Sequence, residues 1–223
     1  MKPFRFLFIG FLVLNMLNLN AQVVRFEKDK LEPINVFMSH EKLIGKDVVK
    51  VTKNPALKEV DQPTFVKIKG TNFQNGTIEV SVLSRLLPDA NELARGFIGV
   101  AFRINEDYTK FESIYIRPTN ARADDQIRRN HTLQYFSFPD FPFSRTRKET
   151  PEKYESYADM TLNEWIKIKI TVKDSKAQLF INDAAQPSLI VIDLKHGADS
   201  SGAIGLWVDV GTEGYFADLK ISK

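Results

Sequence analysis

Short runs in which apolar and polar residues alternate recur along most of this chain, and they limit its fold more than any other feature. In the run 165–172 isoleucines alternate with lysines, and the runs 76–83 and 202–208 follow the same period. Successive side chains of a strand point to opposite faces of a sheet, so a period of two predicts strands with one buried face. Gly, Pro, Asn and Asp separate the runs, as turns between strands require.

The alternation predicts an all-β chain. The expected strands lie at 23–26, 34–38, 47–53, 64–69, 76–83, 96–104, 110–117, 133–136, 164–172, 176–181, 188–192, 202–208 and 215–221. Only 87–94 and a turn around 40–44 are helix candidates, and Pro88 limits the first. Many close strands without helix-length crossovers predict two antiparallel sheets stacked as a jelly-roll β-sandwich. No linker or repeat divides residues 22–223, which are expected to form a single domain.

The first 21 residues differ from the rest and predict a secretory signal peptide. Lys2 and Arg5 precede the apolar run 6–14, and the small polar stretch 18–21 follows it. This order is typical of a cleaved export signal, whereas a membrane-spanning helix needs about 20 apolar residues. An uncleaved N-terminal anchor is the alternative. We expect a mature protein that begins near Gln22, is secreted or periplasmic, and has no membrane segment.

Charge and cysteine content exclude several classes of function. Without the first 21 residues the chain has 29 basic and 28 acidic residues. A nucleic-acid-binding surface needs a basic excess or stripe, so nucleic acid is not an expected partner. Cysteine is absent, which excludes disulfides, thiolate metal sites and a cysteine nucleophile.

The same alternation assigns side chains to the two faces of each strand. The predicted core residues are Ile78, Val80, Val82, Ile98, Val100, Phe102, Ile114, Ile116, Ile166, Ile168, Ile170, Ile204, Leu206 and Val208. The outward residues of interest are Glu79, Arg103, Tyr115, Arg117 and Trp207, with Gly99 and Ala101 among them.

These outward residues predict a sugar-binding face if their strands are neighbours in one curved sheet. The small residues would then leave room above the sheet, and the charged and aromatic ones would surround it. Sugar hydroxyls form hydrogen bonds with Arg guanidinium groups and with carboxylates, and the C–H faces of sugars stack on aromatic rings. A structural Glu–Arg network covered by a loop is the alternative.

The polar segment 117–135 is a second candidate region, because long loops attached to rigid sheets often carry function. Its candidate ligand-binding residues are Asn120, Arg128 and Gln134. Its candidate catalytic residues are Asp124, Asp125 and His131, with a structural role as the alternative for the histidine. The aromatic and proline-rich stretch 136–157 is expected to be a packed loop or the wall of a cleft.

Six segments carry a resemblance to known proteins: 75–79, 96–103, 115–118, 134–135, 164–169 and 202–207. Together they resemble the concanavalin A-like lectin/glucanase superfamily over about residues 65–223. More narrowly, the chain is similar to laminin G-like domains and to bacterial 3-keto-disaccharide hydrolase-like domains, which are also labelled family 16 glycoside hydrolase-like. The resemblance implies a jelly roll and a carbohydrate partner, for binding or for hydrolysis. A non-catalytic laminin G-like adhesion or protein-interaction module is the alternative.

One motif of the resemblance is missing. Family 16 glycoside hydrolases carry E-x-D-x-x-E on a strand, and here Ser81 stands where the Asp after Glu79 would be. Retaining glycosidases need two carboxyls about 5 Å apart, so ordinary retaining chemistry is not expected, although a pair of Glu79 with Asp124 or Asp125 stays open. The 3-keto-disaccharide hydrolase resemblance implies instead a base, Glu79 or His131, that removes a proton next to a keto group.

The residues themselves predict no cofactor and no metal site. The laminin G-like resemblance implies calcium at a loop rim, with Asp124, Asp125 or Asp209 as ligands. An Asp-rich series of ligands is absent from the sequence.

Overall fold

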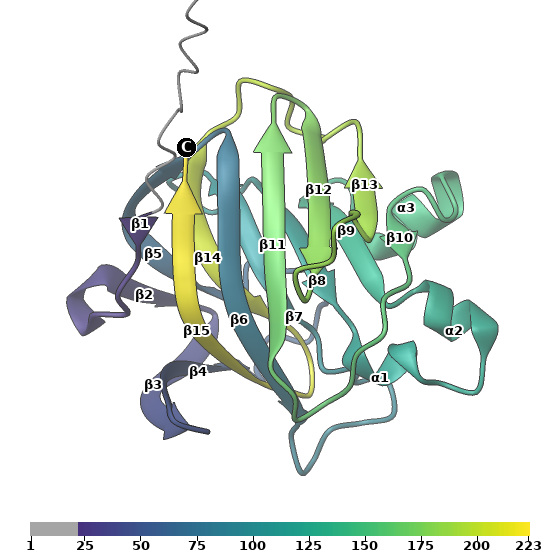
Figure 1. The fold of residues 1–223 in the computed structure, drawn as a ribbon, viewed down its shortest axis with the longest axis horizontal. Helices are drawn as coiled ribbons and strands as arrows, with labels where there is room; N and C mark the ends of the chain where they lie inside the picture. Colours follow the sequence, from purple (N-terminus) through teal and green to yellow (C-terminus); the bar gives the residue numbers. More distant parts are fainter. Residues whose placement is uncertain (1–21) are drawn as a thin grey trace, which may run out of the picture.

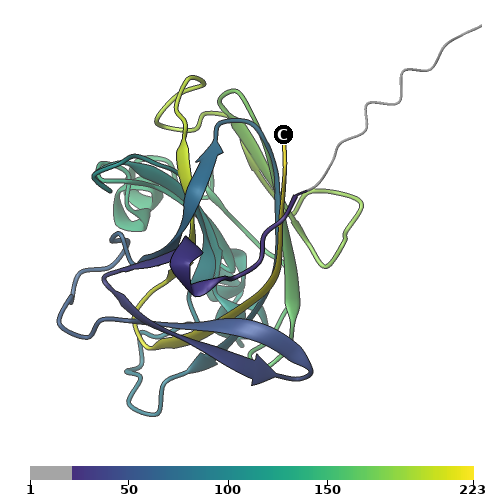
Figure 2. The same ribbon diagram turned by 90° about the vertical axis from the view of Figure 1, so that its left-hand side faces the viewer.

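The computed structural model describes residues 22–223, and the predicted signal peptide 1–21 lies outside this range. The chain forms two antiparallel sheets that stack face to face (Figure 1 and Figure 2). In spatial order, the eight-stranded sheet contains β13 (Leu189–Val191), β12 (Lys176–Ile181), β11 (Ile166–Lys173), β6 (Gly76–Leu86), β15 (Thr212–Ser222), β4 (Lys46–Lys53) and β3 (Val36–Leu43), and β1 (Gln22–Val23) pairs with β15. The seven-stranded sheet contains β10 (Glu155–Ser156), β9 (Leu133–Phe138), β8 (Phe111–Ile116), β7 (Ile98–Ile104), β14 (Gly202–Val208), β5 (Phe65–Phe73) and β2 (Leu31–Ile34). The predicted all-β jelly-roll sandwich is confirmed.

Helices are short and lie between strands. The 3-10 helix η1 (Lys28–Lys30) precedes β2, and α1 (Pro118–Ala121), α2 (Gln126–Asn130) and α3 (Phe143–Glu149) group at the right of Figure 1, beside β9 and β10. Both helix candidates from the sequence are wrong, because 87–94 consists of turns and most of 40–44 belongs to β3. Helices of one or two turns have too few residues for a 3.6-residue period to be read. In residues 22–223 no helix is long and apolar enough to cross a membrane.

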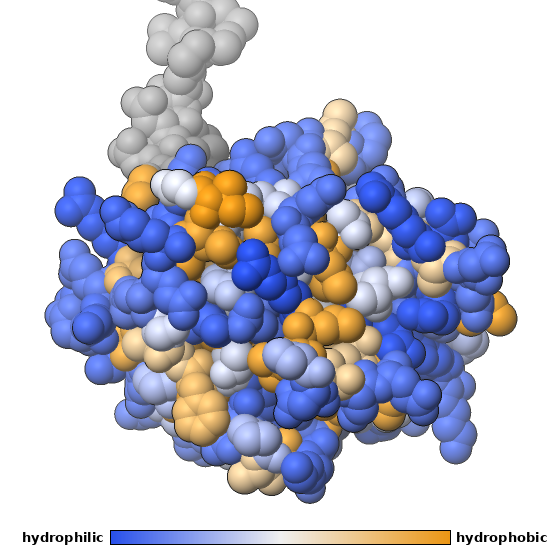
Figure 3. All heavy atoms as spheres, turned by 90° about the horizontal axis from the view of Figure 1, so that it is seen from below, coloured by the Kyte–Doolittle hydropathy of each residue, from blue (hydrophilic) through white to orange (hydrophobic). Residues whose placement is uncertain are grey.

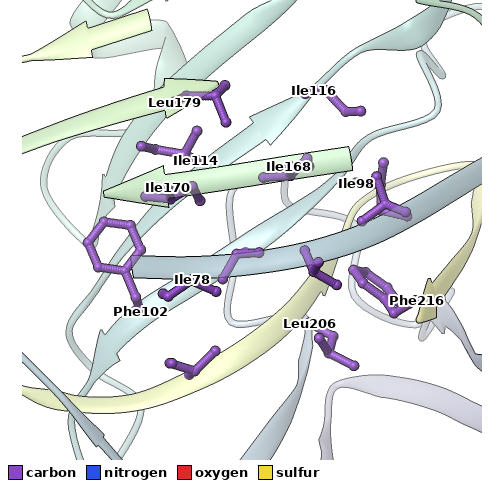
Figure 4. Close-up of a cluster of buried hydrophobic side chains, with 14 of the residues drawn as sticks. Ile78, Ile98, Phe102, Ile114, Ile116, Ile168, Ile170, Leu179, Leu206 and Phe216 are labelled. Carbon is purple, nitrogen blue, oxygen red and sulfur yellow. The ribbon is translucent and has the colours of Figure 1, made fainter. Parts of the chain in front are cut away.

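The core between the sheets is the predicted one. Every residue that the alternation assigned to it is buried. Figure 4 shows how side chains of the two sheets meet, with Ile78 and Ile168 from one sheet and Ile98, Ile114 and Leu206 from the other. Full burial of such a side chain contributes about 1.5–3 kcal/mol. A chain without disulfides must derive its stability mainly from this layer.

Arg103 does not point to the outer face of its sheet, as the alternation had predicted. The pairing of β7 with β14 shifts register between Ala203 and Gly205, and Arg103 has a φ of 54°. Such a bulge places an extra residue in one strand and redirects its side chains. The Arg103 guanidinium therefore points to the end of the sandwich, where it is buried.

Three loops are tied together by Arg103. It donates to the backbone carbonyls of Gln74 at 2.8 and 3.0 Å, Asp174 at 2.7 Å and Gly197 at 2.8 Å. These carbonyls belong to the β5–β6, β11–β12 and β13–β14 connections. The predicted role of Arg103 in substrate binding is therefore corrected to a structural one.

Arg103→Ala should lower the free energy of unfolding by roughly 3 kcal/mol, because a buried side chain and its four hydrogen bonds to three loops are lost. Urea unfolding followed by circular dichroism measures this change. Arg122→Ala is a matched control, since the ion pair of Arg122 with Asp159 is exposed and its loss should leave the free energy of unfolding nearly unchanged. An Arg103→Ala protein as stable as the wild type would contradict this assignment.

Candidate functional site

The outer face of the seven-stranded sheet, which was predicted to be an open sugar site, is filled by aromatic rings. Gly99 pairs with Trp207 on one side and with Tyr115 on the other. The two rings meet with centroids 4.7 Å apart, and a Cβ on Gly99 would lie 2.5 Å from the Cα and Cβ of Tyr115. Trp207 is 0% exposed and donates Nε1–H to the Gln62 carbonyl at 3.0 Å. The prediction that Trp207 contacts a ligand is therefore wrong. Its ring packs within a second buried cluster, on the outer side of this sheet.

Glu79 lies on the opposite side of the molecule. Its strand β6 belongs to the eight-stranded sheet, whereas Tyr115 and Trp207 belong to the other one. Glu79 pairs across strands with Lys169 and lies 3.9 Å from the Lys167 ammonium. Alternation predicts which side chains of a strand share a face, but it does not predict the sheet to which the strand belongs. The assumption that all these strands are neighbours in one sheet was therefore wrong. The structure therefore does not bring Glu79 together with the other predicted site residues.

Asp124 and Asp125 lie in the turn before α2. The Asp125 carboxylate accepts hydrogen bonds from the amides of Ile127 at 2.8 Å and Arg128 at 3.1 Å, which makes it the N-cap of this helix. Asp124 is exposed. Neither carboxylate lines the cavity described below, so their predicted catalytic roles receive no support from their positions.

The calcium ligands implied by the laminin G-like resemblance do not fit a cation. Asp209 already accepts from the Lys53 ammonium at 2.6 Å and from the Asp61 amide at 2.9 Å, and Asp125 caps α2. No cluster of three or more metal-ligating side chains occurs within residues 22–223.

Five of the predicted catalytic and ligand-binding residues do come together, around a cavity of about 470 Å³ that we call the Arg117 pocket. They are Tyr115, Arg117, Asn120, Arg128 and His131. Other loops contribute Lys58, Asp61, Arg95, Phe97, Phe143, Arg147 and Asp209. In Figure 1, α1, which carries Asn120, lies at the lower right, and α3, which carries Phe143 and Arg147, lies higher on the same side. Figure 3 shows the molecule from below, where hydrophobic patches lie among hydrophilic residues.

Arg117 follows β8 and forms the buried base of the pocket. Its Nη2 donates to the Tyr115 hydroxyl at 2.7 Å and to Gln134 Oε1 at 3.0 Å. Its Nη1 donates to the His131 carbonyl at 2.9 Å and to Glu155 Oε1 at 3.0 Å. Gln134, predicted to contact substrate, thus holds Arg117 from behind. These bonds fix a positive charge beneath the cavity.

Glu155 joins α3 to this base. Its carboxylate accepts from Arg147 Nε at 3.1 Å as well as from Arg117, and lies 3.5 Å from His131 Nε2. Burial opposes the charged form of Glu155, but the hydrogen bond from Arg147 and the two guanidinium charges outweigh burial and lower its pKa. Burial lowers the pKa of His131; the charge of Glu155 opposes this shift, and the charges of Arg147 and Arg117 add to it. His131 is therefore mainly neutral at pH 7 and able to accept a proton.

Asp61 is the most perturbed carboxyl of the pocket. Burial raises its pKa to about 7, the charge of Asp209 adds to the shift, and the Phe143 amide, Arg117 and Lys53 oppose it. Its Oδ2 accepts from the Phe143 amide at 2.6 Å. A strongly shifted carboxyl in a cavity is a candidate acid or base, since proton transfer is most efficient when the pKa lies near the working pH.

Sequence reasoning did not single out Asp61, Arg147 or Phe143, and it named Asp209 only as a calcium ligand implied by the resemblance. The stretch 136–157 was expected to be a packed loop or a cleft wall, and Phe143 and Arg147 do form such a wall. No local pattern marks Asp61 or Asp209, because each lies in a connection and their proximity depends on how β4, β5, β14 and β15 are arranged.

No protein-family model and no curated protein matches the chain. Among solved structures it is similar to carbohydrate binding module CBM66 from Bacillus subtilis, at 13% identity and a TM-score of 0.57, with 86% of this chain and 96% of that chain covered. A protein of unknown function with a galectin-like fold, also from Bacillus subtilis, matches at 10% identity and 0.54, covering 87% and 89%. A predicted glycosyl hydrolase from Parabacteroides distasonis matches at 12% and 0.50, covering 87% and 88%. These similarities show a likeness of fold.

The titration of Asp61 should appear in the stability of the protein. Its pKa is about 7 in the folded state against an ordinary 3.8, so between these values the folded protein holds a proton that the unfolded chain has released. The resulting stabilisation is full below about pH 4 and is lost as pH rises through 7, by up to about 1.4 kcal/mol per pH unit. Relative to Asp61→Asn, the wild type should lose roughly 2–3 kcal/mol between about pH 5 and 8 in urea unfolding.

Asp124→Asn is the matched control, because Asp124 is exposed and its replacement should leave the pH dependence unchanged. Parallel curves for the wild type and Asp61→Asn would contradict the elevated pKa of Asp61.

Proposed function

We propose that the protein binds carbohydrate in the Arg117 pocket. The observation that carries this proposal is the convergence of guanidinium, amide and carboxyl groups with the rings of Phe97 and Phe143 around one cavity. Arg and Asn groups bond to sugar hydroxyls, and aromatic rings pack against sugar C–H faces. The cavity of about 470 Å³ lies within the range of about 300–1,000 Å³ usual for small-molecule sites.

The fold gives this proposal independent support. One of the similar structures is called a carbohydrate binding module, and the similarity extends over most of both chains. Jelly rolls also serve other functions, so the fold narrows the choice while the pocket carries the proposal. We place the site in the loops at the end of the sandwich, in contrast to the sheet face expected from the sequence.

Cleavage of glycosides is a second candidate, favoured by the pKa of Asp61 near 7 and the lowered pKa of His131 in the same pocket. For the 3-keto-glycosides suggested by the sequence resemblance, neutral His131 would remove the proton next to the keto group. The electron pair left on carbon then forms a double bond as the bond to the leaving oxygen breaks. Protonated Asp61 would donate its proton to that oxygen.

We also propose that residues 1–21 direct export, so that the pocket meets its ligand outside the cytoplasm. A role in adhesion to another protein is the competing interpretation.

Incubation of the protein with a panel of glycans and 3-keto-glycosides tests both carbohydrate candidates, when glycan retention and released sugar are measured together. Arg128→Met should weaken retention by roughly tenfold or more, because it removes charged donors from the pocket. Asp61→Asn should stop any release while retention persists. Glu79→Gln is the control on the opposite side and should change neither quantity.

If the wild type retains no glycan and releases no sugar, the carbohydrate proposal is wrong and a protein partner becomes the better explanation. If Asp61→Asn releases sugar as well as the wild type does, only the proposed catalytic role of Asp61 is wrong.

A further inference from the structure

We propose that the ligand of the Arg117 pocket is an acidic saccharide, whose carboxylate or sulfate group binds between Arg95 and Arg128 above Arg117. This inference rests on the proposed carbohydrate function and specifies its ligand class. Its basis is an excess of positive charge in the cavity that the protein itself does not neutralise.

Basic side chains dominate the lining of the pocket. They are Lys58, Arg95, Arg117, Arg128 and Arg147, whereas the lining carboxyls are Asp61 and Asp209 alone. Asp209 is already paired with Lys53 at 2.6 Å. Asp61 has a pKa of about 7, so it carries only part of a negative charge at neutral pH. The lining of a nearly neutral protein is therefore strongly basic.

The buried partner behind the pocket does not remove this excess. Glu155 is shared by Arg117 and Arg147, so one carboxylate serves two guanidinium groups. With Glu155 and Lys53 included, six basic side chains face three carboxyls. Charges within a partly enclosed site are screened less than charges on an open surface.

Arg95 and Arg128 have no carboxylate partner within residues 22–223. Arg95 Nη1 donates to the backbone carbonyls of Glu92 and Ala94. Arg128 has one long hydrogen bond, from Nη2 to Asn120 Oδ1 at 3.4 Å, and its buried Nε has no partner in this part of the chain. Unpartnered donors on partly buried guanidinium groups are available for an anion.

The guanidinium groups are also close enough to repel one another. Burial lowers the pKa of Arg95, and the charges of Arg128 and then Arg117 lower it further. An anion between these groups would relieve that repulsion and satisfy the open donors. Arg forks bond to carboxylates and sulfate-like groups in charge-assisted geometry, which makes such bonds about twice as strong as neutral ones.

A pair of matched ligands tests the inference: an oligosaccharide of uronic acids, and the same oligosaccharide with its carboxyls reduced to primary alcohols. Calorimetric titration of the wild type should show the acidic form binding roughly tenfold or more tightly. Raising the salt from about 0.05 M to 0.5 M should narrow the gap in part, because salt screens the attraction between the basic pocket and the carboxylates of the ligand. A sulfated, carboxyl-reduced form distinguishes sulfate from carboxylate recognition.

Pocket variants provide the second part of the test. Arg128→Met should reduce the ratio of acidic to reduced-ligand affinity by roughly tenfold, and Arg128→Lys should keep part of it, since it retains the charge but not the fork. A folding defect would weaken both ligands alike and leave the ratio unchanged. Arg122→Met, which removes an exposed arginine paired with Asp159, is the matched control and should leave the ratio as in the wild type.

The outcomes separate the two proposals. Equal binding of the acidic and reduced forms would overturn the acidic class and leave carbohydrate binding in place. An unchanged ratio in both Arg128→Met and Arg95→Met would also overturn it. Failure of all acidic and neutral saccharides to bind would overturn the proposed function itself.

Discussion

Both faces of the seven-stranded sheet are buried at its central strands β7 and β8, and the position of the candidate site follows from this constraint. β7 and β8 are buried at every residue, with an apolar core on one side and an aromatic cluster around Trp207 on the other. A ligand cannot reach such a sheet without displacing packed rings, and losing the burial of one large aromatic side chain costs about 3–5 kcal/mol. These two strands therefore meet solvent only through the loops at their ends.

Arg117 converts that loop end into a defined cavity. One guanidinium links the end of β8 to β9 through Gln134 and to β10 through Glu155, and Glu155 in turn holds α3 through Arg147. Removal of one partner of a buried ion pair is costly because the other charge stays buried. The same bonds that order these loops leave positive charge facing the cavity, so the stability of the site and its preference for an anion have a common origin.

Alternation of side chains predicted the strands, the core and the fold class, because a period of two is a local property that each strand carries alone. It assigned Glu79 and Trp207 to outward faces correctly, yet the two faces lie on opposite sides of the sandwich. The polar segment 117–135 pointed to the pocket, because the polarity of a loop can also be read from the local sequence. Asp61 could not be found from the sequence, since its role depends on a contact with Asp209. Arg103 was assigned to the wrong face, because a bulge breaks the alternation there.

Mapping of backbone amide shifts by NMR during titration with a saccharide that binds tests most directly the claim that the loop-end pocket is the site. We predict that the largest shifts fall in 58–61, 91–97 and 117–131, which line the pocket, with little change around Glu79 and Lys167 on the far sheet. Large shifts on that far face, with none around Arg117, would contradict the account.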